Sequence, residues 1–206
     1  MRGIIFDGER LRLTDALSVR EPGPGEVKLR VLRSGICHSD LNMVEAKARA
    51  PIVLGHEAAA QVIALGPGVS DFAVGEHVVV GTQTPCGTCR ECERGTPANC
   101  DETWGITPRT PFTWEGQPAY SFANVSSFAQ EIVARATQLY RTGDLPPEQA
   151  ALIGCAVSTG YAAARVLGKA DDWLFDLAQK DGAVSGSPPL DAMRVLRQSR
   201  TSFESA

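Results

Sequence analysis

The sequence has no excess of positive charge, no long apolar run and no apolar segment at its start. Its 206 residues carry 20 Lys and Arg against 24 Asp and Glu, a net charge of −4, so nucleic-acid binding is not expected. No stretch approaches the roughly 18–20 consecutive apolar residues of a membrane helix. Residues 1–10 contain no apolar core of a secretory signal. We therefore expect a soluble, cytoplasmic protein that contacts neither nucleic acid nor a membrane.

Turn-forming residues are frequent and divide residues 1–140 into short extended pieces. The chain has 20 glycines and 13 prolines, and its 43% of apolar residues argues against disorder. Alternating or continuous apolar patterns predict strands over 27–33, 58–65, 76–81 and 128–134. Because short strands with Gly and Pro turns are typical of barrels and sandwiches, we expect a mainly β core with short helices.

The pattern changes after Tyr140. Prolines in a first turn predict a short helix over 146–152, and an alanine-rich run predicts a second over 160–167. Residues 171–206 are first acidic and loop-like, and Leu190, Met193 and Leu196 are spaced for one face of a short helix. We interpret 171–206 as a divergent tail.

Four of the six cysteines form a dense cluster, Cys86-x2-Cys89-x2-Cys92-x7-Cys100. Without a secretory signal, such clustering favours a metal site over disulfides. Four thiolates at this spacing suit a tetrahedral zinc ion, whose role would be structural because no coordination position stays open. A pair of disulfides or an iron–sulfur cluster remains an alternative. We expect a zinc-binding lobe over about residues 84–102.

Three other candidate ligands are far apart in sequence: Cys37, His56 and Cys155. Two thiolates and one imidazole match a known catalytic zinc pattern with an open fourth position. Taken singly, each residue also fits an ordinary core position, because free cysteines are often buried as small apolar residues. Spacing alone leaves both interpretations open.

The motifs taken in order resemble the zinc-dependent alcohol dehydrogenases of the medium-chain superfamily. These are 35–40 (GICHSD), 55–57 (GHE), the four-cysteine cluster and 154–160 (GCAVSTG). The resemblance runs over about residues 1–170. It implies a GroES-like (chaperonin-10-like), partly open β-barrel over 1–156, and a helix over 157–170 that would lead into a nucleotide-binding domain.

The resemblance also implies roles for individual residues. Cys37, His56 and Cys155 would bind a catalytic zinc, and the four clustered cysteines a structural one. Ser39 would take the proton of the alcohol, Asp40 would orient His56, and Glu57 would lie near the metal. His38 and Thr159 would contact the nicotinamide cofactor. Many members have a histidine where this chain has Asn42, so the proton would leave through water or another group.

The chain contains no Gly-x-Gly-x-x-Gly motif of a dinucleotide-binding fold. We therefore expect the nucleotide-binding domain to be absent, as in a truncated gene product, and the protein to be a monomer. The resemblance implies alcohol–aldehyde interconversion with NAD(P) and two zinc ions, and we expect independent activity to be impaired. The alternatives are a zinc-binding structural or interaction module, or a redox-responsive thiol protein.

One aromatic-rich stretch allows two interpretations. Its side chains either line an apolar substrate pocket or pack a long loop. They are Trp104, Phe112, Trp114, Tyr120 and Phe122.

Overall fold

A computed structural model describes residues 1–47, 49–101 and 109–167. The chain divides after Cys155 into a first unit, Met1–Cys155, and a second, Ala156–Ala206. In the second unit the described element is the helix α4 (Ala156–Leu167), which matches the alanine-rich helix predicted from the sequence. Trp104 and the residues predicted to form a short helix in the tail lie outside the described residues. Among the described helices, none has the length and apolarity needed to cross a bilayer.

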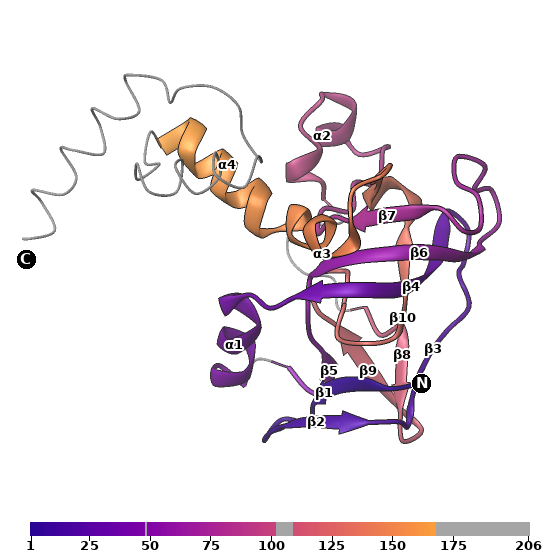
Figure 1. The fold of residues 1–206 in the computed structure, drawn as a ribbon, viewed down its shortest axis with the longest axis vertical. Coiled ribbons are helices and arrows are strands. Elements are labelled where there is room, and N and C mark those ends of the chain that lie inside the picture. The colour runs from indigo at the N-terminus through magenta and orange to yellow at the C-terminus, as the bar shows by residue number, and fades with distance from the viewer. Residues whose placement is uncertain (48, 102–108, 168–206) are drawn as a thin grey trace, which may run out of the picture. The chain divides into compact units, whose positions relative to one another are not determined.

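The described part of the first unit consists mainly of short strands in two sheets, in the orders β2-β1-β5-β9-β8-β3 and β10-β4-β6-β7-β11 (Figure 1). This confirms the expectation of a mainly β fold with short helices. The strands of the first sheet are β1 (Gly3–Phe6), β2 (Leu11–Thr14), β3 (Leu17–Val19), β5 (Ile52–Val53), β8 (Phe112–Trp114) and β9 (Gln117–Ser121). Those of the second are β4 (Glu26–Gly35), β6 (Glu57–Leu65), β7 (His77–Val80), β10 (Glu131–Arg135) and β11 (Leu139–Arg141).

The long antiparallel pair β4 and β6 is the centre of the second sheet. In β4, Val27 and Leu29 are fully buried while Arg30 is exposed, so the alternation seen in the sequence becomes one buried and one open face. The pairing slips between Lys28 and Leu29 and again before Arg33. Such irregularities bend a strand and increase its twist. Beyond them, the end of β4 and the start of β6 lie side by side, and the candidate site is built there.

The apolar faces of the two sheets share one core. Branched and aromatic side chains from both sheets pack together, so the curled sheets enclose a half-barrel interior. The larger fully buried side chains of this core are Ile5, Leu17, Val27, Leu29, Val53, Val62, Val78, Phe112 and Ile132.

Short helical segments lie between the strands and after the last of them. They are α1 (His38–Glu45), α2 (Arg90–Glu93), η1 (Pro97–Asn99), η2 (Ala136–Gln138), α3 (Pro147–Ala150) and η3 (Ala151–Gly154). The helix predicted over 146–152 is thus one α-helical turn that continues as a 3₁₀ turn to Gly154.

Two local expectations need correction. From residue 109 onward, the aromatic-rich stretch is not a long loop, because β8 and β9 form an antiparallel hairpin and Phe112 is buried in the core. The strand predicted over 128–134 begins later, at Glu131. The Phe128 amide instead donates to the Leu54 carbonyl, which lies outside any strand.

Candidate metal centres

The lobe cysteines converge on one point. One sulfur from each of Cys86, Cys89, Cys92 and Cys100 lies within 4.8 Å of the others, and the Cys86 and Cys92 sulfurs are 4.0 Å apart. None of the four is joined in a disulfide, so the alternative of paired disulfides is not what the structure shows. Zinc–sulfur bonds of about 2.3 Å place tetrahedral sulfurs about 3.8 Å apart. The spacing therefore fits a single zinc ion and leaves no room for several irons between the sulfurs.

Backbone amides hold the sulfurs of this lobe. Thr88 and Cys89 donate their amides to the Cys86 sulfur at 3.4 and 3.2 Å, and the Cys86 amide donates to the Cys100 sulfur at 3.3 Å. The Thr88 amide is the main cause of the lowered pKa of the Cys86 thiol. Burial and the neighbouring sulfurs raise the pKa of Cys92 to about 12. Four thiolates at this distance therefore need a cation among them.

Side chains between β10 and β11 form hydrogen bonds with the backbone that leads into the lobe. Buried Gln138 donates to the Gly81 carbonyl at 2.8 Å and to the Asn124 carbonyl at 3.1 Å. The Thr137 hydroxyl donates to the Pro85 carbonyl at 3.2 Å, directly before Cys86. The lobe is thus tied to the second sheet as well as organised internally.

The second cluster joins residues from three distant segments. Cys37 lies between β4 and α1, His56 and Glu57 lie at the start of β6, and Cys155 follows η3. One donor atom from each of the four lies within 4.8 Å of the others. His56 and Glu57 are buried, whereas both cysteines are partly exposed. The structure therefore brings together the three ligands suggested by the sequence, with Glu57 as a fourth donor.

Asp40 connects the segments that carry these donors. Its Oδ2 accepts the Cys37 amide at 3.0 Å, and its Oδ1 accepts the Gly55 amide at 2.8 Å. The same Oδ1 lies 3.4 Å from His56 Nδ1, an electrostatic contact rather than a good hydrogen bond. Because Nδ1 faces Asp40, the other ring nitrogen of His56 is left for the cluster.

Protonation in the second cluster follows from these contacts. The Ser39 amide and hydroxyl, with His56 beside them, lower the pKa of the Cys37 thiol. The Asp40 carboxylate raises the pKa of His56 above its ordinary value and outweighs the effect of burial. Burial raises the pKa of Asp40, but His56 and the two amides prevail and lower it. The thiolate form of Cys37, which metals bind, is therefore favoured.

Glycines precede the ligands, a feature that the sequence analysis did not use. Gly55 has a φ of +86°, and a Cβ there would overlap the Ser127 hydroxyl and the Phe128 ring. A Cβ on Gly154 would lie 2.7 Å from the Val80 carbonyl. The sequences Gly-His and Gly-Cys at these ligands therefore mark close approach of the backbone to its neighbours.

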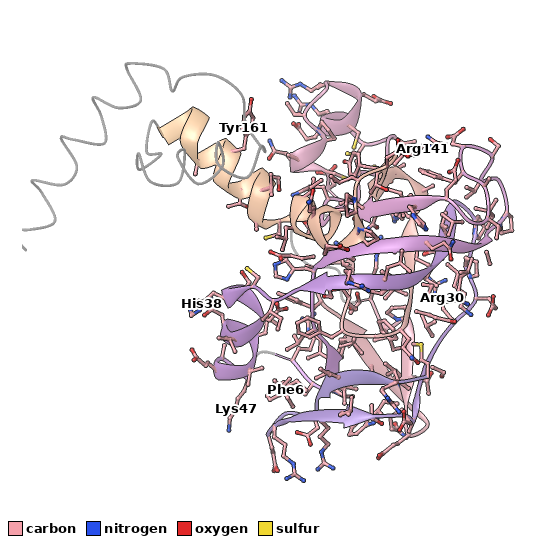
Figure 2. The ribbon with its side chains drawn as sticks, viewed as in Figure 1. Phe6, Arg30, His38, Lys47, Arg141 and Tyr161 are labelled. Carbon is pink, nitrogen blue, oxygen red and sulfur yellow. The ribbon has the colours of Figure 1, made fainter. Side chains whose placement is uncertain are left out.

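Of the other residues predicted to take part in catalysis or cofactor binding, Ser39 lies beside the second cluster, whereas Thr159 lies in the second unit. The Ser39 hydroxyl is exposed, 3.6 Å from the Cys37 sulfur. His38 is exposed at the start of α1, as Figure 2 shows. The Phe122 ring meets the His56 ring edge-on, with centroids 5.2 Å apart. Thr159 is exposed on α4 in the second unit, so it is described apart from the cluster.

The donor sets of both clusters fit zinc. Sulfur and imidazole donors are those that zinc prefers, and each set lies within the reach of one ion. Four sulfurs make the lobe a closed site. Two sulfurs, one imidazole and one carboxylate make the second cluster a mixed site.

Comparison with known proteins agrees with this geometry. The family model described as "Alcohol dehydrogenase GroES-like domain" matches residues 23–144. "Alcohol dehydrogenase-like 6" of Arabidopsis thaliana is 33% identical over 165 residues, which are 76% of this chain and 43% of that protein. "S-(hydroxymethyl)glutathione dehydrogenase" of Haemophilus influenzae is 34% identical over 158 residues, or 71% of this chain and 42% of that protein.

Solved structures with the same fold include proteins named as alcohol dehydrogenases. An alcohol dehydrogenase zinc-binding domain protein from Burkholderia ambifaria superposes with a TM-score of 0.71 at 30% identity, over 79% of this chain and 47% of that one. Benzyl alcohol dehydrogenase from Acinetobacter calcoaceticus gives 0.68 at 30% identity, over 80% and 47%. The expected GroES-like fold is thereby confirmed. The chain spans less than half the length of these relatives.

Proposed function

The chain belongs to the alcohol dehydrogenase GroES-like domain family, and from this we propose that its first unit is the zinc-binding catalytic domain of an alcohol dehydrogenase. The reaction is the interconversion of an alcohol and an aldehyde by hydride transfer to or from NAD(P). The observation that carries the proposal is the meeting of Cys37, His56, Glu57 and Cys155 donor atoms within 4.8 Å. Their segments are far apart in sequence, and an unrelated fold would have no reason to assemble them.

In this proposal the two clusters have different roles. The four lobe sulfurs hold a structural zinc, because they fill every position of a tetrahedral ion. Cys37, His56 and Cys155 hold a catalytic zinc, and Glu57 lies beside it. Bound there, zinc acts as a Lewis acid on the alcohol or carbonyl oxygen of the substrate.

Residues of this chain accept the proton of the alcohol and orient the metal ligands. The exposed Ser39 hydroxyl beside Cys37 accepts the proton of the alcohol and passes it to water, since Asn42 does not titrate. Asp40 fixes the His56 ring and the turn that carries Cys37. His38 and Thr159 contact the nicotinamide cofactor in this proposal, His38 through the charged cofactor phosphates.

We infer NAD(P) affinity, oligomeric state and cellular compartment from one missing motif and from the cysteines. These 206 residues contain no Gly-x-Gly-x-x-Gly motif, so by themselves they offer no helix N-terminus of the kind on which dinucleotide-binding folds hold the pyrophosphate. For a protein made of these residues alone, we expect weak NAD(P) binding, low activity and a monomer. A reducing, cytoplasmic setting suits six cysteines that form no disulfide.

A second candidate function is a zinc-binding structural or interaction module without catalysis. Two apolar side chains next to the second cluster favour it, because Ile36 is 79% exposed and Leu41 47% exposed. Exposed apolar side chains mark a surface that binds another protein when they form one contiguous patch. Both candidates require the same two metal ions and differ in turnover.

Metal analysis and cofactor titration separate these possibilities. We expect about two zinc ions per chain, one of which is lost in Cys37→Ser while the fold is kept. An NADH titration of the zinc-loaded protein, followed by cofactor fluorescence, then decides between the candidates. Saturable binding with alcohol-dependent turnover that disappears in Cys37→Ser supports the dehydrogenase. Two zinc ions with no binding up to millimolar NADH would favour the module, and turnover surviving Cys37→Ser would contradict the assignment of the second cluster.

A further inference from the structure

Gly35 and Glu57 lie directly opposite each other where β4 and β6 pair at the second cluster. A Cβ built on Gly35 would overlap the Glu57 Oε2 and would lie 2.9 Å from its Cδ and 3.0 Å from its Cβ. The Glu57 carboxylate therefore occupies the space that a side chain at position 35 would fill. Real Cβ atoms essentially never make contacts this short.

The glycine at position 35 is required by this space and not by the backbone. Gly35 is not one of the glycines with positive φ, so alanine can adopt its backbone conformation. Gly55, in contrast, combines a φ of +86° with close contacts. A side chain at position 35 would therefore act by steric overlap with the Glu57 side chain and not by straining the backbone.

The Glu57 carboxylate is placed for a cation. Glu57 is 3% exposed, and within residues 1–47, 49–101 and 109–167 no hydrogen bond or ion pair reaches its carboxylate. Its oxygens are not among the enclosed polar side-chain atoms of the described residues that lack a partner, so they stay accessible to a ligand. The neighbouring donors of Cys37, His56 and Cys155, all within 4.8 Å, mark the place where a metal ion would balance the carboxylate charge.

We propose that Gly35 is a positioning residue of this metal centre, because its missing side chain gives the Glu57 carboxylate its place among the donors. The inference rests on the proposed function, since it needs a metal ion at the second cluster. A methyl group at position 35 would turn the carboxylate away from the ion. The loss of this electrostatic support would weaken metal binding at the second cluster by about tenfold, as for other residues that support ligands.

Cadmium-113 NMR tests this, because each metal site of the cadmium-loaded protein gives its own resonance. In Gly35→Ala we expect the signal of the second cluster to shift and its cadmium to pass to a competing chelator about tenfold more readily. The four-thiolate signal of the lobe is the internal control and stays in place. Gly160→Ala is the matched variant, since a Cβ there meets nothing within 4 Å.

A double-variant series shows whether Gly35 acts through Glu57. In the Glu57→Ala background the space is free, so adding Gly35→Ala should cause no further change. In the Glu57→Gln background the side chain keeps its size, so Gly35→Ala should again shift the signal. Two wild-type resonances with no change in Gly35→Ala, or an equal change in the Glu57→Ala background, would overturn the inference alone. A single wild-type resonance, from the lobe, would overturn the proposed catalytic metal centre as well.

Discussion

Asp40 Oδ1 lies 3.4 Å from His56 Nδ1 and accepts the Gly55 amide at 2.8 Å. Through its other oxygen, the same carboxylate accepts the Cys37 amide at 3.0 Å. One buried side chain therefore fixes both the ring of one candidate ligand and the turn that carries another. The position of Asp40 in the first turn of α1 makes this helix part of the site, although the rest of α1 has no buried residue.

Replacing Asp40 with asparagine should weaken zinc at the second cluster. Asparagine keeps the size but lacks the negative charge that orients and polarises His56. Because residues supporting a ligand typically contribute 10- to 100-fold to metal affinity, we expect a loss of about this size, measured by chelator competition. Asp15→Asn is the control, because Asp15 is exposed and pairs with Arg2. Equal affinities in Asp40→Asn and wild type would contradict this role.

The two clusters should lose their metals independently. Cys100 is buried in the lobe, and Cys100→Ser removes one of four thiolates there without touching the second cluster. We expect zinc content to fall from about two ions per chain to about one, with the second cluster still loaded. Cys155→Ser should also leave about one zinc ion per chain, but here the second cluster is empty and the lobe stays loaded. Mass spectrometry of the metal content and cadmium NMR check both, and joint loss of both ions in either variant would show that the sites are coupled.

Gln138 should contribute strongly to stability. It is fully buried, donates to the carbonyls of Gly81 and Asn124, and accepts the Arg135 amide at 3.1 Å. Gln138→Ala leaves these groups without their partner and should lower the free energy of unfolding by about 2–3 kcal/mol. Urea denaturation measures the change. The exposed Gln117 is the matched control, and Gln117→Ala should change stability by less than about 0.5 kcal/mol.

The β1–β2 turn should respond to acid. The amides of Arg10 and Glu9, with Arg12 nearby, lower the pKa of Asp7 from 3.8 to about 2. Because the folded pKa is lower than the unfolded one, the stabilisation is complete above pH 3.8 and is lost as the pH falls toward 2. Wild type should therefore be more stable than Asp7→Asn at pH 5 and lose that advantage near pH 2. An Asp7 carboxyl that titrates near 3.8 by NMR would refute the prediction, and Asp144→Asn serves as an exposed control.

Four strands of the second sheet were predictable from the sequence, and those of the first sheet were not. In β4, β6 and β7 the runs of valine and alanine cross a buried sheet, so their pattern is clear. In β2 the sequence LRLT alternates over only four residues, and its apolar Leu11 and Leu13 are exposed, so the pattern does not mark a buried face. Two- and three-residue strands such as β5 and β3 are defined by pairing with distant partners, which one sequence does not reveal.

The lobe and the second cluster also differ in how far the sequence alone predicts them. The lobe ligands lie close together in sequence, so spacing alone suggested a common ion. Cys37, His56 and Cys155 were suggested by family resemblance, and only the fold shows that β4, β6 and η3 bring them together. The space at Gly35 was invisible in the sequence, because it depends on which side chain lies across the sheet.

The length of chain between ligands gives the two centres an order of assembly. The lobe sulfurs fall within residues 86–100, a loop that closes quickly, whereas Cys37 and Cys155 are more than a hundred residues apart. The lobe can capture its ion once its own turns have formed, while the second cluster must wait until the sheet is complete. A filled second centre therefore reports that the whole first unit has folded, and a protein caught early in folding carries metal in the lobe alone.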